Sequence, residues 1–399
     1  MPDDVGFIVA LMLAAVLAAA GLPSENIVYP RILQSRDQNG ERTLYIRRGL
    51  VLSLERSRVF SDNFVFSIDG GVNRLDKLMN GKDLEKNMYQ DRNHSSVVFV
   101  DEEKGAVQVT GILDNKFSIE PIASSHRSED DLVGHRLLDL EDIDNPLGDD
   151  SVRDLSLSAQ DVGLSSSEVT ERKLKKLPEE FVVEVRIFSA PSHGINKTMD
   201  DLIQYFGLIM SKVNQFYRQL SKPKVQFVVV GITKLTNDSF ARLVPDPANN
   251  RTVISLCATV GSFYKYVKAT LAQDAQDAVV YVSSLSASVL SGCSSNCGVC
   301  SGNTVTTQSL NFRQPRNWES YVIAHELGHL LGMAHEGSCP PHHTPGNEGL
   351  RCRKQEFGSV MGSGKPPHYF SRCLQDQTRG CLMTRTKKCF ELTGAKKIF

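Results

Sequence analysis

At positions 325–335 the chain reads His325-Glu326-Leu327-Gly328-His329-Leu330-Leu331-Gly332-Met333-Ala334-His335, the pattern H-E-x-x-H-x-x-G-x-x-H. Residues four apart share one face of a helix, so His325 and His329 project side by side and can provide two ligands of a tetrahedral zinc site. Gly332 permits a sharp turn that brings His335 round as the third ligand. Three protein ligands leave the fourth position to water, which is typical of a catalytic zinc.

Two more residues extend this pattern. Glu326 follows the first histidine, where a carboxylate can reach a zinc-bound water and act as its general base. Downstream, Ser359-Val360-Met361-Gly362 places a methionine in a tight turn after the third histidine. We expect Met361 to form an apolar floor beneath the histidines without binding the metal. A core helix with accidentally aligned histidines would not account for Gly332, His335 or Met361.

Length and composition set the frame around this stretch. The chain has 399 residues, 41% hydrophobic and 23% charged, with a net charge of −1. The composition is that of an ordinary globular protein, and the length allows two or three domains. The near-zero net charge does not favour a nucleic-acid or anionic-membrane partner. An apolar run from Phe7 to Ala20 predicts a signal peptide over 1–20, with a membrane anchor as the alternative because the leading residues are acidic. No stable membrane association is expected.

The cysteines and sequons fit a secretory route. With a signal peptide, a cysteine-rich C-terminal half predicts disulfides formed in an oxidising compartment, although spacing does not fix the pairing and the odd number leaves one cysteine over. The nine cysteines all lie in the second part of the chain: Cys257, Cys293, Cys297, Cys300, Cys339, Cys352, Cys373, Cys381 and Cys389. Four N-x-S/T sequons predict a glycoprotein: Asn93, Asn196, Asn237 and Asn250.

The part before the histidine pattern divides into two predicted regions. Residues 21–122 read as a β-rich domain, with a hairpin over Ala106–Pro121 that turns at Asp114-Asn115. Residues 123–176 are acidic and predict a poorly ordered linker. The linker ends in the basic cluster Arg172–Lys176, where we expect a processing protease to cut. The β-rich domain has no cysteine; if it blocks the predicted zinc it must use another ligand, and His126 or His135 near the acidic linker is a candidate, against the simpler interpretation of two solvated histidines.

Residues 177–399 form the third predicted region, which contains the zinc pattern. Strands and helices alternate here, which predicts an α/β (α+β) domain with a twisted mixed sheet and helices packed on it. After His335 no regular pattern is expected, and residues 296–308 are a candidate edge strand. The expected strands are Phe181–Ser189, Val225–Thr233 and Ala278–Ser284, and the expected helices are Met199–Leu220, Val253–Ala272 and Trp318–Leu331.

The zinc pattern followed by Met361 resembles the metzincin metalloproteases. The phrase Lys116–Pro121, a cysteine soon after the third histidine (Cys339) and Phe370-Ser371-Arg372-Cys373 are similar to the reprolysin, or adamalysin, branch. Within it, Ile27–Arg31 resembles the opening of secreted tick salivary metalloproteases. This resemblance implies a secreted zinc endopeptidase, made as a zymogen with residues 21–122 as its propeptide, that hydrolyses internal bonds of extracellular proteins such as host matrix or clotting proteins.

The same resemblance implies further features of the domain. The substrate would lie extended along the edge strand, and a small, irregular, disulfide-held subdomain would follow the zinc helix. Calcium would bind away from the zinc, with Glu184 and Asp277 as ligands. Glu336 departs from the adamalysin pattern, which has Asp after the third histidine, and is typical of astacins, so an astacin-like endopeptidase is the alternative. A zinc-retaining binding protein without catalysis is the alternative from another class.

Overall fold

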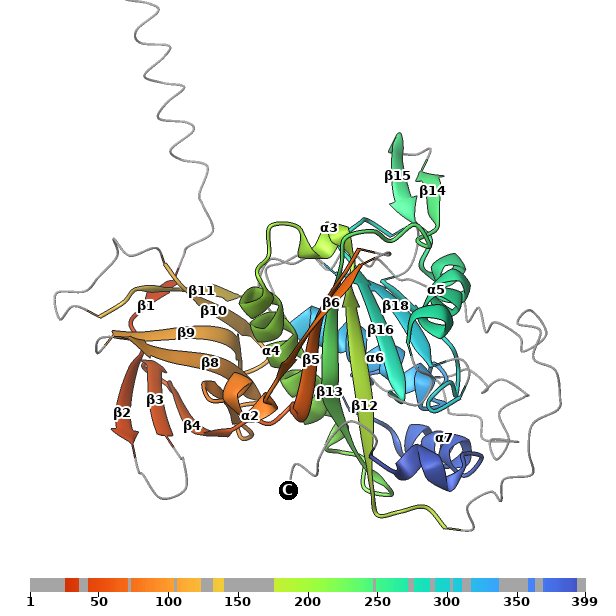
Figure 1. The fold of residues 1–399 in the computed structure, drawn as a ribbon. Helices are drawn as coiled ribbons and strands as arrows, with labels where there is room; N and C mark the ends of the chain where they lie inside the picture. Colours follow the sequence, from red (N-terminus) through yellow and green to blue (C-terminus); the bar gives the residue numbers. More distant parts are fainter. Residues whose placement is uncertain are drawn as a thin grey trace, which may run out of the picture.

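The fold was obtained as a computed structural model (Figure 1). Among the described residues, no helix is long and apolar enough to cross a membrane. The predicted signal peptide, most of the predicted linker and about half of the segment after Glu336 lie outside the described residues. The structure describes residues 26–35, 42–70, 73–103, 106–122, 132–139, 176–246, 249–271, 276–287, 291–301, 304–310, 317–336, 358–362 and 369–392.

The N-terminal part is built on a nine-stranded sheet in the order β1-β11-β10-β9-β8-β7-β4-β3-β2. The predicted hairpin is β9 and β10, and its turn residues Asp114 and Asn115 have φ of 50° and 55°, as a tight hairpin turn requires. β11 pairs antiparallel with both β1 and β10, although it lies beyond residue 122. The strands are β1 (Asn26–Val28), β2 (Arg31–Ser35), β3 (Arg42–Arg47), β4 (Leu50–Arg56), β7 (Met88–Asp91), β8 (Ser96–Glu103), β9 (Ala106–Leu113), β10 (Phe117–Pro121) and β11 (His135–Asp139).

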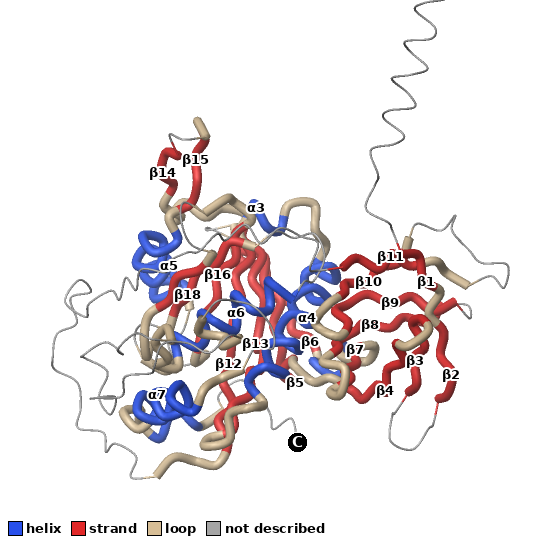
Figure 2. Tube along the Cα trace, turned by 180° about the vertical axis from the view of Figure 1, so that it is seen from behind, coloured by secondary structure: helices blue, strands red, loops and turns tan. Residues whose placement is uncertain are grey.

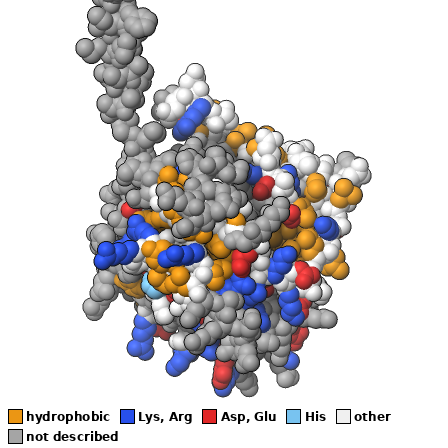
Figure 3. All heavy atoms as spheres, turned by 90° about the vertical axis from the view of Figure 1, so that its left-hand side faces the viewer, with side chains coloured by type: hydrophobic (Ala, Val, Ile, Leu, Met, Phe, Trp, Pro, Cys, Tyr) orange, Lys and Arg blue, Asp and Glu red, His pale blue; other side chains and the backbone are white. Residues whose placement is uncertain are grey.

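One side of the N-terminal part faces away from the rest of the molecule. Hydrophobic side chains on this side are interspersed with lysine and arginine (Figure 3). Arginines also stack on aromatic rings of the sheet, as Arg31 does on Tyr45 and Arg47 on Phe117. This sheet has a core of its own, which contains Leu44, Leu52 and Val98. The predicted β-rich character of this region is confirmed.

A second sheet has seven strands in the order β17-β18-β16-β12-β13-β5-β6. Neighbours are parallel except that β17 runs antiparallel to β18 and β6 antiparallel to β5. β5 and β6 come from the N-terminal part of the chain. The strands are β5 (Phe60–Asp69), β6 (Arg74–Met79), β12 (Glu180–Ser189), β13 (Lys224–Leu235), β16 (Ala278–Ser283), β17 (Gly292–Ser294) and β18 (Val305–Ser309); β14 (Leu243–Asp246) and β15 (Arg251–Ile254) form a separate hairpin.

Helices pack on both faces of this sheet because alternate residues of each strand point to opposite sides. Val183, Val185 and Ile187 of β12 join the main core with α4 and α6, whereas Phe188 packs with α5 on the other face. Figure 2, which is seen from behind Figure 1, shows α4 and α6 together in front of the sheet. The helices are α2 (Gly81–Leu84), α3 (Pro191–Gly194), α4 (Met199–Tyr217), α5 (Leu256–Thr270), α6 (Asn317–Leu330), α7 (Arg372–Leu382) and the short 3-10 helix η1 (Lys387–Phe390).

The predicted strands and helices of this domain are confirmed, with two corrections. The edge strand is β17 at Gly292–Ser294, not residues 296–308, because β18 within that range lies between β16 and β17. Residues Val305–Gln308 of β18 are buried. The polar Thr and Gln side chains there make hydrogen bonds inside the protein and do not indicate an edge strand. The second correction is α7, a regular helix in the segment where none was expected.

Three disulfides between described residues hold the C-terminal part, and spacing could not have paired them. Cys257–Cys293 joins the start of α5 to β17. Cys297–Cys381 and Cys300–Cys389 join the turn after β17 to α7 and η1. Cys373 is also disulfide-bonded. The cross-links fasten the last helices beneath the end of α6, which confirms the predicted disulfide-held C-terminal part.

Candidate metal centre

Helix α6 and the turn after it bring three histidines together. The Nε2 atom of His335 lies 3.0 Å from Nε2 of His325 and 3.1 Å from Nε2 of His329. The ligand atoms of this group all lie within 4.8 Å of one another. Bonds of about 2.0–2.1 Å from zinc to each nitrogen fit such a separation. All three predicted histidines therefore converge on one point.

The tautomers of two histidines follow from their backbone partners. His325 Nδ1 lies 2.8 Å from the Val360 carbonyl, and His329 Nδ1 lies 2.8 Å from the Met333 carbonyl. A carbonyl oxygen only accepts hydrogen bonds, so each Nδ1 carries the proton and donates. In a neutral ring this leaves a lone pair on Nε2, aimed at the common point. Such outer partners fix ring orientation in metal sites.

Burial keeps these rings neutral, which is the form that binds metal. It lowers the pKa of His325 to about 3, with help from nearby His329, and the pKa of His329 to about 4. The pKa of His335 is also lowered, first by burial and then by the other two rings. Three neutral nitrogens with converging lone pairs are a donor set that suits zinc.

The third histidine reaches the site because α6 ends at Gly332. This glycine has φ of +91°, and its N–H donates to the His329 carbonyl at 2.8 Å while Met333 N–H donates to Gly328 at 2.9 Å. Paired bonds of this kind close helices that end in a left-handed glycine. A Cβ on Gly332 would lie 2.5 Å from Cβ of Cys381, so the turn and α7 are tightly packed.

Met361 lies under the histidines, fully buried, in the turn after residue 358. A Cβ on Gly328 would lie 2.6 Å from the Met361 sulfur, so this small residue between the two histidines of α6 leaves room for the methionine. The turn is tied to the helix by the Tyr321 hydroxyl, which donates to the Gly362 carbonyl at 2.9 Å. Met361 therefore packs against the helix that carries the histidines, in the place expected for an apolar support that does not bind the metal.

Glu326 is 5% exposed, and one of its carboxylate oxygens, Oε2, has no hydrogen-bond partner although it is buried. Burial raises the pKa of this carboxyl well above its ordinary value, which makes it a stronger proton acceptor. The other side of the carboxylate lies against Gly292 in β17, where a Cβ would overlap it. A buried, unpartnered carboxylate oxygen beside the histidines is suited to bind a water there.

Glu336, the departure from the adamalysin pattern, has a specific place. Its N–H donates to the Met361 carbonyl at 3.0 Å, and its Oε1 accepts from the Ser359 hydroxyl at 3.1 Å. Through these two bonds Glu336, the residue after the third histidine, is attached to the turn that contains Met361. Sequence reasoning did not find this link, nor the backbone carbonyls that orient the rings, since a carbonyl carries no sequence signal.

Other predicted residues lie elsewhere. His135 is buried in the N-terminal sheet, where Nδ1 donates to Val133 O at 2.9 Å and Nε2 accepts from Val109 N at 2.8 Å. Both of its nitrogens are used, so His135 is not a zinc ligand here; His126 lies outside the described residues. Glu184 on β12 lies beside Asp277, which immediately precedes β16, and the Glu184 N–H donates to Asp277 Oδ2 at 2.9 Å.

Known proteins resemble this chain over most of its length. Residues 180–392 match the reprolysin (M12B) family zinc metalloprotease. Venom metalloproteinase BumaMPs1 of Olivierus martensii is 23% identical over 356 residues, which cover 82% of this chain and 84% of that protein. A metalloproteinase of Tityus obscurus is 22% identical over 376 residues, covering 90% and 96%. These relatives do not test the narrower resemblance to tick salivary proteases, which stays a prediction.

A solved structure, metalloproteinase-II from Bacteroides fragilis, covers 93% of this chain and 95% of its own, with 11% identity and a TM-score of 0.38. The family match spans the whole second sheet apart from β5 and β6, the zinc helix and the disulfide-held end. It includes the three converging histidines and Glu326. The chain belongs to the reprolysin (M12B) family of zinc metalloproteases.

Proposed function

We propose that this metalloendopeptidase is secreted, is made as a zymogen, and hydrolyses internal peptide bonds of extracellular proteins with Glu326 as its general base. Family membership makes the chain a zinc metalloendopeptidase. The assignment of individual residues rests on the geometry of the metal centre. His325, His329 and His335 would hold the zinc through Nε2.

The chemistry divides between the metal and the chain. Zinc, when bound, supplies a Lewis acid that makes water more acidic and polarises a carbonyl. Glu326 takes a proton from the attacking water on its free Oε2 and later returns it to the leaving nitrogen. The Val360 and Met333 carbonyls hold the imidazoles in the tautomer that offers Nε2. Met361 supports the rings from below.

The observation that carries this proposal is the unpartnered Oε2 of Glu326 beside three converging Nε2 atoms. Replacing Glu326 by Ala should keep zinc near one equivalent and the thermal unfolding midpoint near that of the wild type. Peptidase activity should fall by roughly 10²–10⁴-fold, the contribution of a general base. Zinc content by atomic emission and hydrolysis of a quenched peptide would be measured on the same sample. Wild-type hydrolysis by Glu326→Ala would exclude this role.

The substrate strand would pair with β17. Among the described strands, β17 pairs with β18 on one side only, and Gly292 faces the Glu326 carboxylate. An extended peptide added to this side would bring its backbone to the catalytic carboxylate, by the usual mode of strand addition. Host matrix and clotting proteins are the proposed substrates. Digestion of fibrinogen or gelatin that a chelator abolishes would support them.

Secretion and processing complete the proposal. Residues 1–20 would be the signal peptide, 21–122 the propeptide, 123–176 the linker cut near Lys176, and 177–399 the protease domain. The four sequon asparagines are exposed, as glycosylation requires, and two relatives are named as venom proteins. N-terminal sequencing of secreted protein would test both cleavages. A single N-terminus upstream of residue 21 would contradict them.

We also propose a calcium site at Glu184 and Asp277. Glu184 is buried and Asp277 is half-buried, and loss of solvation together with the Glu184 charge raises the pKa of Asp277 to about 8. One Asp277 oxygen lies 3.2 Å from Sγ of Cys300, which is in a disulfide and has no hydrogen to donate. Two carboxyl groups side by side can share a proton or a cation, and oxygen ligands suit calcium.

A further inference from the structure

The hairpin β5–β6 leaves the N-terminal part and completes the sheet of the protease domain. β5 runs parallel to β13, with Phe60 opposite Val229 and then Val65–Asp69 opposite Gly231–Leu235. Val229 N–H donates to Val59 O at 2.7 Å, and Thr236 N–H donates to Asp69 O at 2.9 Å. Without β5, the β13 strand would be an edge with unpaired amide groups, a favourable template for strand addition.

The side chains of β5 are part of the protease core. Phe60, Phe64 and Phe66 are at most 3% exposed and belong to one cluster with residues of β12, β13, α4 and α6. Gly207 of α4 meets this region closely, since a Cβ there would lie 3.0 Å from the Met88 sulfur and 3.1 Å from a ring carbon of Phe60. The β5 strand of the N-terminal part therefore contributes its side chains to the core of the protease domain.

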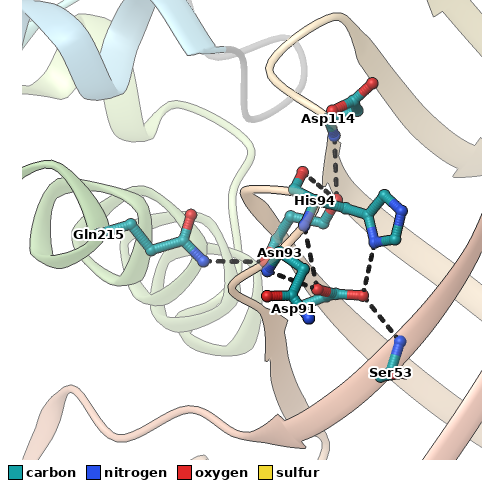
Figure 4. Close-up of polar contacts among 7 residues, drawn as sticks. Ser53, Asp91, Asn93, His94, Asp114 and Gln215 are labelled. Atoms are coloured by element: carbon teal, nitrogen blue, oxygen red, sulfur yellow. Dashed lines mark hydrogen bonds and ion pairs between the residues drawn. The ribbon is translucent and has the colours of Figure 1, made fainter. Parts of the chain in front are cut away.

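A second contact joins the loop Asp91–Ser96, here called the docking loop, to helix α4. Gln215 Nε2 donates to the Ser96 carbonyl at 3.0 Å (Figure 4). Lys212 is buried, and its ammonium donates to the Ser95 carbonyl and to Gln215 Oε1 at 3.0 Å. A buried lysine needs such acceptors, because burying an ammonium group without partners is strongly unfavourable.

The docking loop is held in shape by Asp91 at its own start. The Asp91 carboxylate accepts from Asn93 N at 2.8 Å, His94 N at 3.1 Å and Ser53 N at 2.7 Å (Figure 4). These bonds turn the Ser95 and Ser96 carbonyls outward to the helix. The loop is thus preorganised within the N-terminal part, which lowers the entropic cost of binding α4.

Both contacts lie away from the catalytic edge of the sheet. β5 and β6 are at one end of the strand order and β17, which faces Glu326, is at the other. Helix α4 nevertheless supports the zinc helix, because the Tyr217 hydroxyl donates to the Ala324 carbonyl at 2.7 Å, next to His325. The N-terminal part therefore braces α4, and through it α6, and none of its described strands pairs with β17.

We propose that residues 26–139 remain bound to the protease domain after the linker is cut, as a second chain that supplies two strands of the sheet and the docking loop on α4. The partner for the β13 edge is thus the chain's own N-terminal fragment. The cleavage event rests on the proposed zymogen; the binding itself rests only on the contacts above.

The test uses the full chain with Glu326→Ala, so that the outcome does not depend on peptidase activity. Arg172–Lys176 is replaced by the recognition sequence of an added site-specific protease, and the nicked protein is passed over a sizing column without denaturant. We expect both fragments to elute together at the mass of the intact chain. Hydrogen exchange should show the Val229 and Thr236 amides as protected as before nicking. Separate elution of the fragments would overturn the proposal.

Matched variants on α4 test the docking loop. Lys212→Ala and Gln215→Ala should each speed dissociation of the nicked complex by about tenfold, the usual effect of losing a charged or buried hydrogen bond. Gln204→Ala is the same kind of change on the same helix, at a half-buried position, and should leave the rate unchanged. If all three variants dissociate alike, the docking loop is not part of the interface energy. If Lys212→Ala does not assemble, the nicked Gln204→Ala and Gln215→Ala proteins are compared by the urea concentration that separates their fragments. Gln215→Ala should separate at the lower concentration.

Discussion

The Glu326 carboxylate owes its position to Gly292 in a different strand. A side chain at residue 292 would overlap Cγ, Cδ and Oε1 of the glutamate. The glycine is thus required by the close approach of Glu326 and not by its backbone conformation, since the φ of Gly292 is not positive. At the scale of single residues, the base is aimed by the absence of a side chain.

Gly292→Ala should therefore displace the base while leaving the histidines in place. We expect kcat/KM to fall by about 100-fold, the effect of moving a catalytic group by about 1 Å, with zinc content unchanged. Gly261→Ala is the matched control, because a Cβ there meets nothing within 4 Å. A Gly292→Ala enzyme as active as the Gly261→Ala control would show that the carboxylate has room to move.

At the scale of elements, the end of α6 decides whether the third histidine reaches the first two. Gly332→Ala should cost about 1–2 kcal/mol for the left-handed backbone, and more for the collision with Cys381. Gly49→Ala separates these effects, since Gly49 has φ of +82° and open space around it. Zinc affinity, measured by competition with a chelator, should fall only in Gly332→Ala. Equal affinity in both variants would place the metal-binding geometry elsewhere.

Strands β12 and β16 place Glu184 beside Asp277, which predicts a pH effect. The pKa of Asp277 is raised to about 8 from an ordinary 3.8, so the folded protein holds this proton when the unfolded chain has lost it. Stability from this group is complete below about pH 4 and is lost as pH rises toward 8. Calcium should replace the proton, so it should raise the unfolding temperature more at pH 8 than at pH 5.

Asp277→Asn is the control for this effect, because an amide neither ionises nor binds calcium strongly. The variant should show a flatter dependence of unfolding temperature on pH and little response to calcium. Thermal unfolding followed by circular dichroism at both pH values would measure this. A calcium response in Asp277→Asn as large as in the wild type would refute the site.

On the scale of the whole molecule, the N-terminal part and the protease domain share one sheet. Leu208 of α4 is fully buried in a cluster whose other members, Val97, Phe99 and Ile112, all come from the N-terminal part. Exposing a leucine of this kind costs roughly 1.5–3 kcal/mol. A chain cut to 177–399 would also leave the β13 edge open to aggregation.

Residues 177–399 produced alone should therefore be less soluble and unfold at a lower temperature than the full chain. Supplying residues 21–139 as a separate chain during refolding should restore both. An N-terminal chain with Phe60, Phe64 and Phe66 changed to Ala is the matched control and should not rescue. A truncated domain as soluble and stable as the full chain would show that β5 and β6 are dispensable.

The sequence by itself determined the zinc helix and the type of most elements around it. Periodicity is local, so apolar spacing places α4 and α6 and strands β12, β13 and β16, and turn residues place the β9–β10 hairpin. The histidines at 325 and 329 share a face for the same local reason. Gly332 predicted the end of α6 because only glycine adopts its backbone conformation at little cost.

Tertiary structure decided what local pattern cannot encode. An alternating strand such as β5 specifies a buried face but not its partner, and only packing joined it to β13 in the protease sheet. The disulfide pairs, the edge position of β17 and the approach of Gly292 to Glu326 depend on which distant segments meet. The Val360 and Met333 carbonyls orient the histidines through backbone atoms that every residue carries. The spacing of side chains therefore predicts the zinc-binding residues and the general base. Their surroundings could not be predicted, because contacts between distant segments leave no periodic pattern in the sequence.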